Sequence, residues 1–106
     1  MGSGFLIYKI QQTKYYQSLI TTISGYVTQG ETLSNILIEN GVNNEQSYII
    51  VKLMEKLYDS RKWRVSDKYE LVLHKKEGIL NFKFQTDPLN TYIIEKSKTG
   101  EFTSQH

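Results

Sequence analysis

Residues 27–37 read Val-Thr-Gln-Gly-Glu-Thr-Leu-Ser-Asn-Ile-Leu, a stretch that joins the end of a strand to the start of a helix. Gln29-Gly30-Glu31 is typical of a turn. Thr32 follows it and can cap a helix, because its hydroxyl accepts a hydrogen bond from a free backbone N–H. The next apolar residues fall at i, i+3 and i+4, which is one face of a helix: Leu33, Ile36 and Leu37. The stretch therefore predicts a strand, a tight turn and a capped helix.

A second helix is predicted directly after the first. Asn40-Gly41 ends the first helix, because Asn and Gly tolerate the left-handed conformation found there. Asn43-x-x-Gln46 resembles a capping box, in which each side chain bonds the other residue's backbone N–H. Apolar residues at i, i+3, i+4 and i+7 then mark a helix over about 44–58: Ile50, Leu53, Met54 and Leu57.

Extended segments flank the two helices. Residues 5–10 and 19–28 are rich in β-branched and aromatic residues, with a bulge expected at Gly25. After the helices the apolar pattern changes to period two, which predicts strands over 69–74 and 80–85 joined by a turn at 75–78. A turn at 86–90, a strand over 91–96 and a short strand from residue 101 complete an antiparallel meander. Helices followed by a run of strands predict an α+β domain.

Composition excludes several classes of function. The chain has 106 residues, enough for one core, and contains no Cys and two His, which excludes thiolate zinc sites and makes a multi-histidine metal site inside this chain unexpected. Its formal net charge is +2, with the basic residues spread along the chain, so nucleic acid is not an expected partner. No apolar run reaches the roughly 18–20 residues of a membrane span.

Few residues present themselves for chemistry. Asp59 and Asp67 could form an acid–base pair, but Asp at a helix end or a turn most often bonds local backbone. His74 falls on the polar side of its strand beside two lysines, so we expect it to be solvated. Trp63, within the basic run 61–64, either anchors a loop in the core or stacks on a ligand, and we favour the core.

Two motifs resemble the LysM-like (OapA/LysM-type) domain that precedes the catalytic domain in murein DD-endopeptidases of peptidase family M23. Residues 27–36 match the pattern V-x-x-G-(D/E)-T-L-x-x-I. Residues 59–73 resemble the pattern D-x-R-x-L-R-x-G-D-x-Y-x-V, with Ser66 in place of the family's Gly. The resemblance covers about residues 24–96 and implies a LysM-like β-α-α-β core extended by an antiparallel β-meander. It divides the chain into an N-terminal arm or strand (1–23, whose first residues look added for expression), a LysM-like core (24–75) and a β-hairpin extension (76–106).

The resemblance also implies a function. The family's zinc-binding H-x-x-x-D and H-x-H motifs are absent from the sequence. We therefore expect a non-catalytic cell-envelope domain, without cofactor or metal, that positions or autoinhibits a peptidoglycan peptidase. The parent protein would be a zinc metallopeptidase in the periplasm or cell envelope, with its signal not present in this chain. The expected partners are peptidoglycan or the protein's own peptidase domain. The implied glycan groove lies between two turns and comprises Gly30, Glu31, Thr32, Leu33, Val65, Ser66 and Asp67.

Two other functions stay open at this point. One is a free-standing protein–protein interaction module in the envelope, in which an exposed strand edge of the meander accepts a strand from a partner protein. The other is a small hydrolase that uses Asp59 and Asp67, which has the least support from the sequence.

Overall fold

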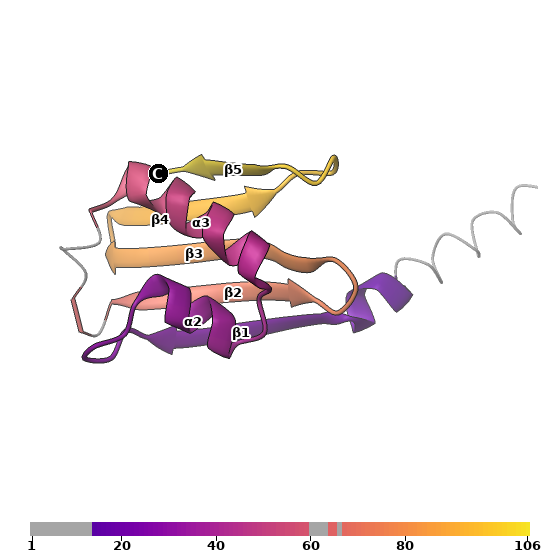
Figure 1. Ribbon diagram of the computed structural model, residues 1–106, viewed down its shortest axis with the longest axis horizontal. Coiled ribbons are helices and arrows are strands. Elements are labelled where there is room, and N and C mark those ends of the chain that lie inside the picture. The colour runs from indigo at the N-terminus through magenta and orange to yellow at the C-terminus, as the bar shows by residue number, and fades with distance from the viewer. Residues whose placement is uncertain (1–13, 60–63, 66) are drawn as a thin grey trace, which may run out of the picture.

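The computed structural model describes residues 14–59, 64–65 and 67–106. Figure 1 shows two helices lying in front of a sheet. In chain order the elements are β1 (Ile20–Tyr26), α2 (Leu33–Glu39), α3 (Asn44–Leu57), β2 (Lys68–His74), β3 (Gly78–Asp87), β4 (Asn90–Lys96) and β5 (Phe102–Gln105). The predicted α+β class and the order β-α-α-β followed by a meander are confirmed. The strand expected at residues 5–10 and Trp63 lie outside the described residues.

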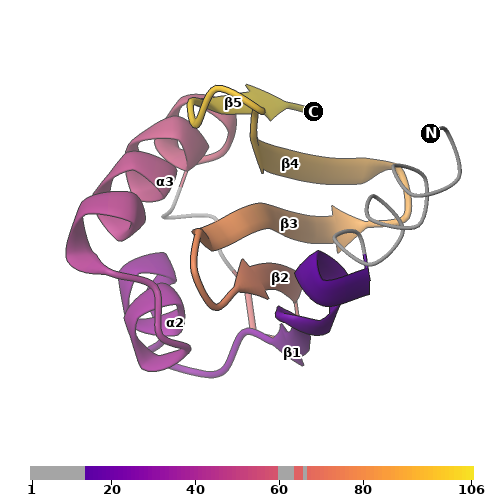
Figure 2. The same ribbon diagram turned by 90° about the vertical axis from the view of Figure 1, so that its right-hand side faces the viewer.

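The five strands form one antiparallel sheet in the order β1-β2-β3-β4-β5. Both helices, α2 and α3, cover the same face of this sheet, and in Figure 2 neither of them lies over the opposite face of β3 and β4. β1 begins at Ile20, so it crosses the boundary expected between residues 23 and 24. The sheet is thus a two-layer scaffold with one packed face and one open face.

Both helices begin at the predicted caps. The backbone N–H of Asn35 donates to Thr32 Oγ1 at 3.2 Å, and that of Gln46 donates to Asn43 Oδ1 at 2.8 Å. The second half of the expected capping box does not form. The Gln46 side chain instead accepts from the backbone N–H of Ile79 at 3.2 Å and donates to the carbonyl of Glu77 at 3.3 Å. The start of α3 is therefore tied to the β2–β3 hairpin.

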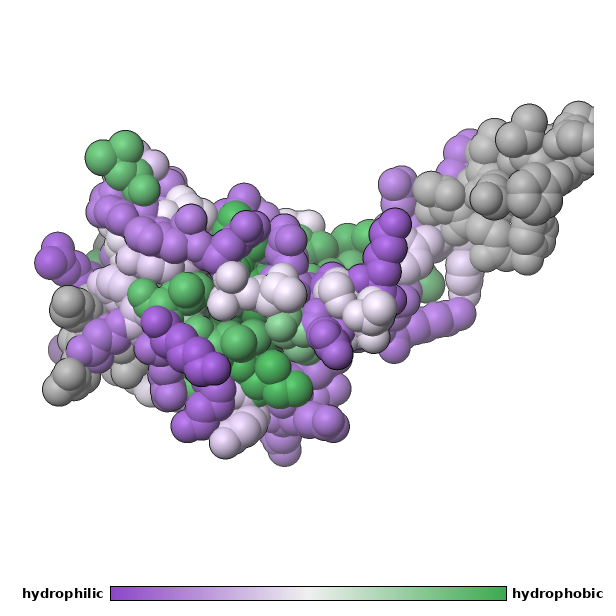
Figure 3. Space-filling view, turned by 90° about the horizontal axis from the view of Figure 1, so that it is seen from above, coloured by the Kyte–Doolittle hydropathy of each residue, from purple (hydrophilic) through white to green (hydrophobic). Residues whose placement is uncertain are grey.

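The core lies between the helices and the packed face of the sheet. Its fully buried residues come from both layers: Ile36, Leu37, Ile50 and Met54 from the helices, and Leu71, Ile79, Phe82, Phe84 and Ile94 from the sheet. Figure 3 views the molecule from the β5 side and shows hydrophobic side chains gathered in the middle of that face, with hydrophilic ones around them. α3 contacts β4 and β5, and Leu53, Leu57 and Phe102 pack against the core only partly buried.

The bulge predicted at Gly25 is wrong. β1 and β2 pair without a shift from Ile20 opposite His74 to Tyr26 opposite Lys68. Gly25 is needed for a different reason, because a Cβ at this position would lie 2.6 Å from the Tyr69 hydroxyl and 2.7 Å from Tyr69 Cζ. The register shift in this part of the sheet lies between Val72 and Leu73 of β2.

The expectation that His74 is solvated is also wrong, because only 4% of the residue is exposed. Residues 14–18 form a short helical turn before β1, and the ring of Tyr16 stacks on the His74 ring. His74 Nδ1 accepts hydrogen bonds from the backbone N–H groups of Lys76 and Glu77 at 3.1 and 3.2 Å. His74 therefore holds the backbone of the β2–β3 turn, and the ring of Tyr16 covers the His74 ring.

Candidate functional site

The two turns expected to flank a glycan groove are joined at their base. The backbone N–H of Val27 donates to the carbonyl of Asp67 at 2.8 Å, which holds the end of β1 against the start of β2. Gly30 has a φ of 82°, a left-handed conformation that favours glycine. The Glu31 carboxylate accepts from the backbone N–H of Thr28 at 2.7 Å and closes the turn in front of α2. The turn that contains Gly30 is thus fixed in place.

The second turn has a structural role for its acidic residue. Asp67 is buried, with 7% of its surface exposed, and its Oδ2 accepts from the backbone N–H of Arg64 at 3.0 Å. Val65 is 61% exposed, and Ser66 lies outside the described residues. Asp in turns commonly accepts hydrogen bonds from nearby backbone N–H groups in this way. This bond and the burial leave Asp67 badly placed for acid–base chemistry.

A cavity of about 270 Å³ opens beside the first turn, between the start of α2 and the second half of α3. Three of the residues predicted for the groove line it: Glu31, Thr32 and Leu33. Gly30, Val65 and Asp67 are not among its lining residues. Ser34 of α2 lies on the same side as Glu31, Thr32 and Leu33. The opposite wall comes from α3 and the residue after it: Val51, Met54, Glu55 and Tyr58. Sequence reasoning missed this wall, although Val51–Glu55 and Met54–Tyr58 each follow the i, i+4 spacing of one helix face.

The chemistry of this cavity combines an apolar base with polar groups. Leu33 and Met54 are buried, while Glu31 and Glu55 bring carboxylates and Ser34 a hydroxyl. Burial raises the pKa of the Tyr58 hydroxyl, and the negative charge of Asp67 raises it further. Tyr58 therefore stays protonated at neutral pH. Its ring is held at 5.7 Å from the Phe84 ring and 5.2 Å from the Tyr92 ring, measured between centroids.

Such a lining can contact a ligand that combines hydrogen-bond donors with apolar parts. Hydroxyl and carboxylate groups can bond amides and hydroxyls of the ligand, while the apolar base contacts its methyl groups or ring faces. Across residues 14–59, 64–65 and 67–106, no three His, Cys, Asp or Glu side chains cluster in a way that could hold a metal ion. None of the helices in these ranges is long and apolar enough to cross a membrane.

Comparison with known proteins gives a fold relative. No family model and no curated protein matches the chain. The structure is similar to the crystal structure of a zinc-containing peptidase from Vibrio cholerae, with a TM-score of 0.69 and 18% sequence identity over 78% of this chain. The match spans 26% of that peptidase, so the chain corresponds to about a quarter of its length. At this identity the likeness establishes a fold shared with part of that zinc-containing peptidase.

Proposed function

We propose that this chain is a LysM-like, non-catalytic accessory domain of a cell-envelope zinc peptidase, and that it positions or autoinhibits the enzyme on peptidoglycan. The observation that supports this proposal is the fold shared with one quarter of a zinc-containing peptidase. The V-x-x-G-E-T-L-x-x-I motif supports it independently, because its turn and cap border the cavity between α2 and α3. Peptidoglycan is the polymer that a domain of this resemblance would meet in the periplasm or cell envelope.

The glycan version of the proposal places N-acetylated sugars in the cavity between α2 and α3. N-acetyl methyl groups would contact Leu33 and Met54, and the amides would bond the hydroxyls and carboxylates at the rim. Because the cavity is small and open to solvent, we expect weak binding, with a dissociation constant on the order of 1 mM. The parent protein would gain avidity because its peptidase domain would bind the same polymer.

A binding assay with matched variants tests the glycan version. The purified domain is incubated with insoluble peptidoglycan and, separately, titrated with a soluble N-acetylglucosamine tetramer by NMR. Ser34→Arg fills the cavity, whereas Asn35→Arg adds the same side chain one residue further along α2, outside the lining. We expect Ser34→Arg to abolish binding and Asn35→Arg to retain it. A wild-type domain whose NMR signals stay unchanged at tetramer concentrations well above the expected dissociation constant removes the glycan version and leaves the autoinhibitory one.

The autoinhibitory version has its own test. The full reading frame is expressed, and the peptidase activity on peptidoglycan is compared with that of the same protein lacking residues 1–106. An inhibitory domain predicts at least a severalfold rise in activity on deletion, whereas a positioning domain predicts a fall. A reading frame without an H-x-H segment contradicts both versions.

A second function, a protein–protein interaction module, is favoured by the free edge of β1. Within the part of the chain that the structure describes, this strand pairs only with β2, and its seven residues contain no charged residue, proline or register shift, which are the usual protections of an edge. A partner strand could add there through main-chain hydrogen bonds. Thr22→Lys would protect the edge, so it should abolish a complex with an envelope protein, while Lys98→Gln on the β4–β5 turn should not.

A further inference from the structure

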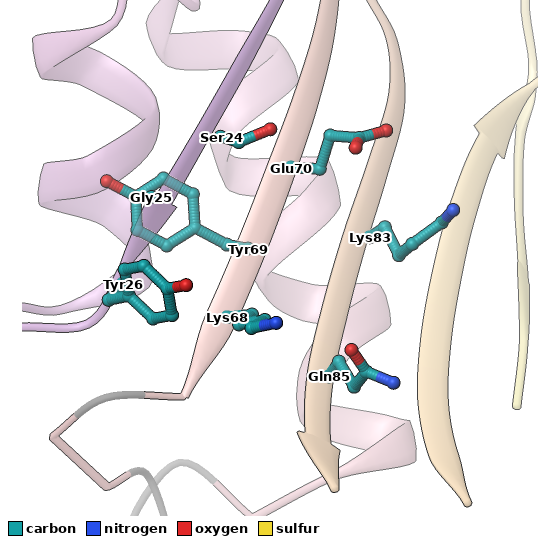
Figure 4. A pocket seen from close by; sticks show the side chains of 8 residues that line it. All are labelled: Ser24, Gly25, Tyr26, Lys68, Tyr69, Glu70, Lys83 and Gln85. Atoms are coloured by element: carbon teal, nitrogen blue, oxygen red, sulfur yellow. The ribbon is translucent and has the colours of Figure 1, made fainter. Parts of the chain in front are cut away.

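The open face of the sheet carries a second cavity, of about 360 Å³, on the side away from the helices. Figure 4 shows the side chains that line it, which come from β1, β2 and β3. The strand register arranges six of them in two rows across the sheet: Ser24, Glu70 and Lys83 in one row, and Tyr26, Lys68 and Gln85 in the other. Between the rows, Phe84 points to the packed face and is fully buried. The two rows therefore stand on a rigid part of the core.

The rows place opposite charges at fixed neighbouring positions. Residues directly opposite on antiparallel strands have Cβ atoms about 4.5–5.5 Å apart, and diagonal neighbours about 7–8 Å. Glu70 is directly opposite Lys83, and Lys68 is diagonal to Lys83. Among the described residues, no ion pair joins Glu70 to either lysine. The cavity thus offers two ammonium groups and one carboxylate to a ligand, with a formal charge of about +1 from these three groups.

We propose that this cavity binds the free C-terminal end of a peptide. In a peptide's last residue, a carboxylate and an amide N–H are separated by one carbon atom. The carboxylate would lie between the ammonium groups of Lys68 and Lys83, and the amide N–H would donate to Glu70 beside them. The Gln85 amide can bond the preceding carbonyl. Capture of a terminal carboxylate by positive groups is a recurrent mode of peptide recognition.

Tyr26, the exposed one of the two tyrosines that line the cavity, favours a peptide over a sugar. Tyr26 is 57% exposed, but Lys68 Nζ lies 5.8 Å from the centre of its ring. This ammonium group occupies a ring face on which a sugar would stack. The contact also holds Lys68 at the cavity. This cavity lies on the opposite face of the sheet from the cavity between α2 and α3 and would take a different ligand.

Two matched peptides test the inference. The ¹⁵N-labelled domain is titrated by NMR with acetyl-Ala-Ala-Ala carrying a free C-terminus and with the same peptide amidated at its C-terminus. We expect the free peptide to shift amide signals of β1, β2 and β3 around Ser24, Glu70 and Lys83. The amidated peptide should bind at least fivefold more weakly, because it lacks the carboxylate.

Variants locate the site. Lys83→Gln and Lys68→Gln should each weaken binding of the free peptide at least threefold, whereas Lys98→Gln, with the same loss of charge on the β4–β5 turn, should change it by less than a factor of two. The NMR spectra of the wild type and of the three variants are first compared to establish that the fold is kept. Equal binding of the two peptides overturns the inference, as does an equal loss in all three variants. If glucuronate shifts the same signals more strongly than the free peptide does, the ligand of this cavity is an acidic sugar and the peptide proposal is wrong.

Discussion

The ring of Tyr16 lies stacked on the ring of His74, with the two centroids 4.3 Å apart. The Tyr16 hydroxyl donates to Glu77 at 2.9 Å, so the same side chain covers the histidine and contacts the turn that the histidine organises. His74 Nδ1 accepts from the backbone of that turn, so its proton lies on Nε2, which is buried and has no hydrogen-bond partner among the described residues.

Removal of the whole Tyr16 side chain should therefore lower the free energy of unfolding more than removal of its hydroxyl alone. Tyr16→Ala is expected to lower the free energy of unfolding by about 1 kcal/mol, because the aromatic contact with His74 is lost. Tyr16→Phe keeps the ring and removes only an exposed hydrogen bond, so it should stay within about 0.5 kcal/mol of the wild type. Urea denaturation measures both. Equal losses in the two variants would contradict a role for the stacked ring.

Gly78 and Gln46 are expected to be coupled. Gly78 has a φ of 80°, and a Cβ there would run into the Gln46 side-chain amide, whereas Gly41 has a φ of 93° with open space around it. Gly41→Ala should cost about 1–2 kcal/mol from backbone strain alone. Gly78→Ala should cost about 1–3 kcal/mol more, because the added methyl displaces Gln46.

A double-mutant cycle isolates that coupling. Gln46→Ala alone should cost about 1–2 kcal/mol, because it leaves the backbone N–H of Ile79 without this acceptor. In the Gln46→Ala background, Gly78→Ala should cost no more than Gly41→Ala does. Additive losses in thermal or urea denaturation would show that the amide is not the obstacle.

Asp87 should titrate below its ordinary pKa of 3.8. The Asn90 side-chain amide donates to its carboxylate at 2.8 and 3.0 Å and is the main cause, with the backbone N–H of Leu89 adding to it at 2.9 Å. These donors favour the charged form, so the contribution of Asp87 to stability is present above pH 3.8 and is lost as the pH falls through the lower folded-state pKa. ¹³C NMR titration of the carboxyl carbon measures this, and Asn90→Ala should move the pKa back toward 3.8.

Asp67 should behave as a structural residue. Asp67→Ala leaves the backbone N–H of Arg64 without its carboxylate partner in a partly buried turn, so we expect a loss of about 1–2 kcal/mol. Asp87→Ala, at an exposed turn, serves as the control and should cost less. Hydrolytic activity of the isolated domain that disappears in Asp67→Ala, without a loss of stability, would revive the carboxylate hydrolase instead.

Local signals in the sequence predicted the elements well, because their causes are local. The caps at Thr32 and Asn43 act within three residues, and the strands of the meander follow one another through short turns. Burial of His74 depends on Tyr16, and the use of Gln46 depends on Ile79, partners far away in sequence. Gly25 shows the same limit, since the ring of Tyr69 that excludes a side chain there belongs to another strand.

The candidate cavity shares only part of its lining with the groove expected from the sequence, for a related reason. The motif around Gly30 indicates its turn and cap, and Glu31, Thr32 and Leu33 of the expected groove line the cavity, while their binding of a glycan stays a prediction. The α3 wall arises because α3 packs beside α2, and apolar spacing in a single helix does not tell which residues face that neighbour. The grouping of six residues on the open face depends on the strand register. The alternation of apolar and polar residues within each strand does not determine that register.

The sheet order, which follows chain order throughout, has a kinetic consequence. β2, β3, β4 and β5 pair with their immediate neighbours through short turns, so these hairpins close at little entropic cost. β1 must instead find β2 across a segment that contains both helices. Because folding slows as paired residues lie further apart in sequence, we expect the meander to form early and β1 to dock last. β1 precedes the other four strands in the chain, yet it would dock after them. Substitutions within β1 should therefore speed unfolding more than they slow folding.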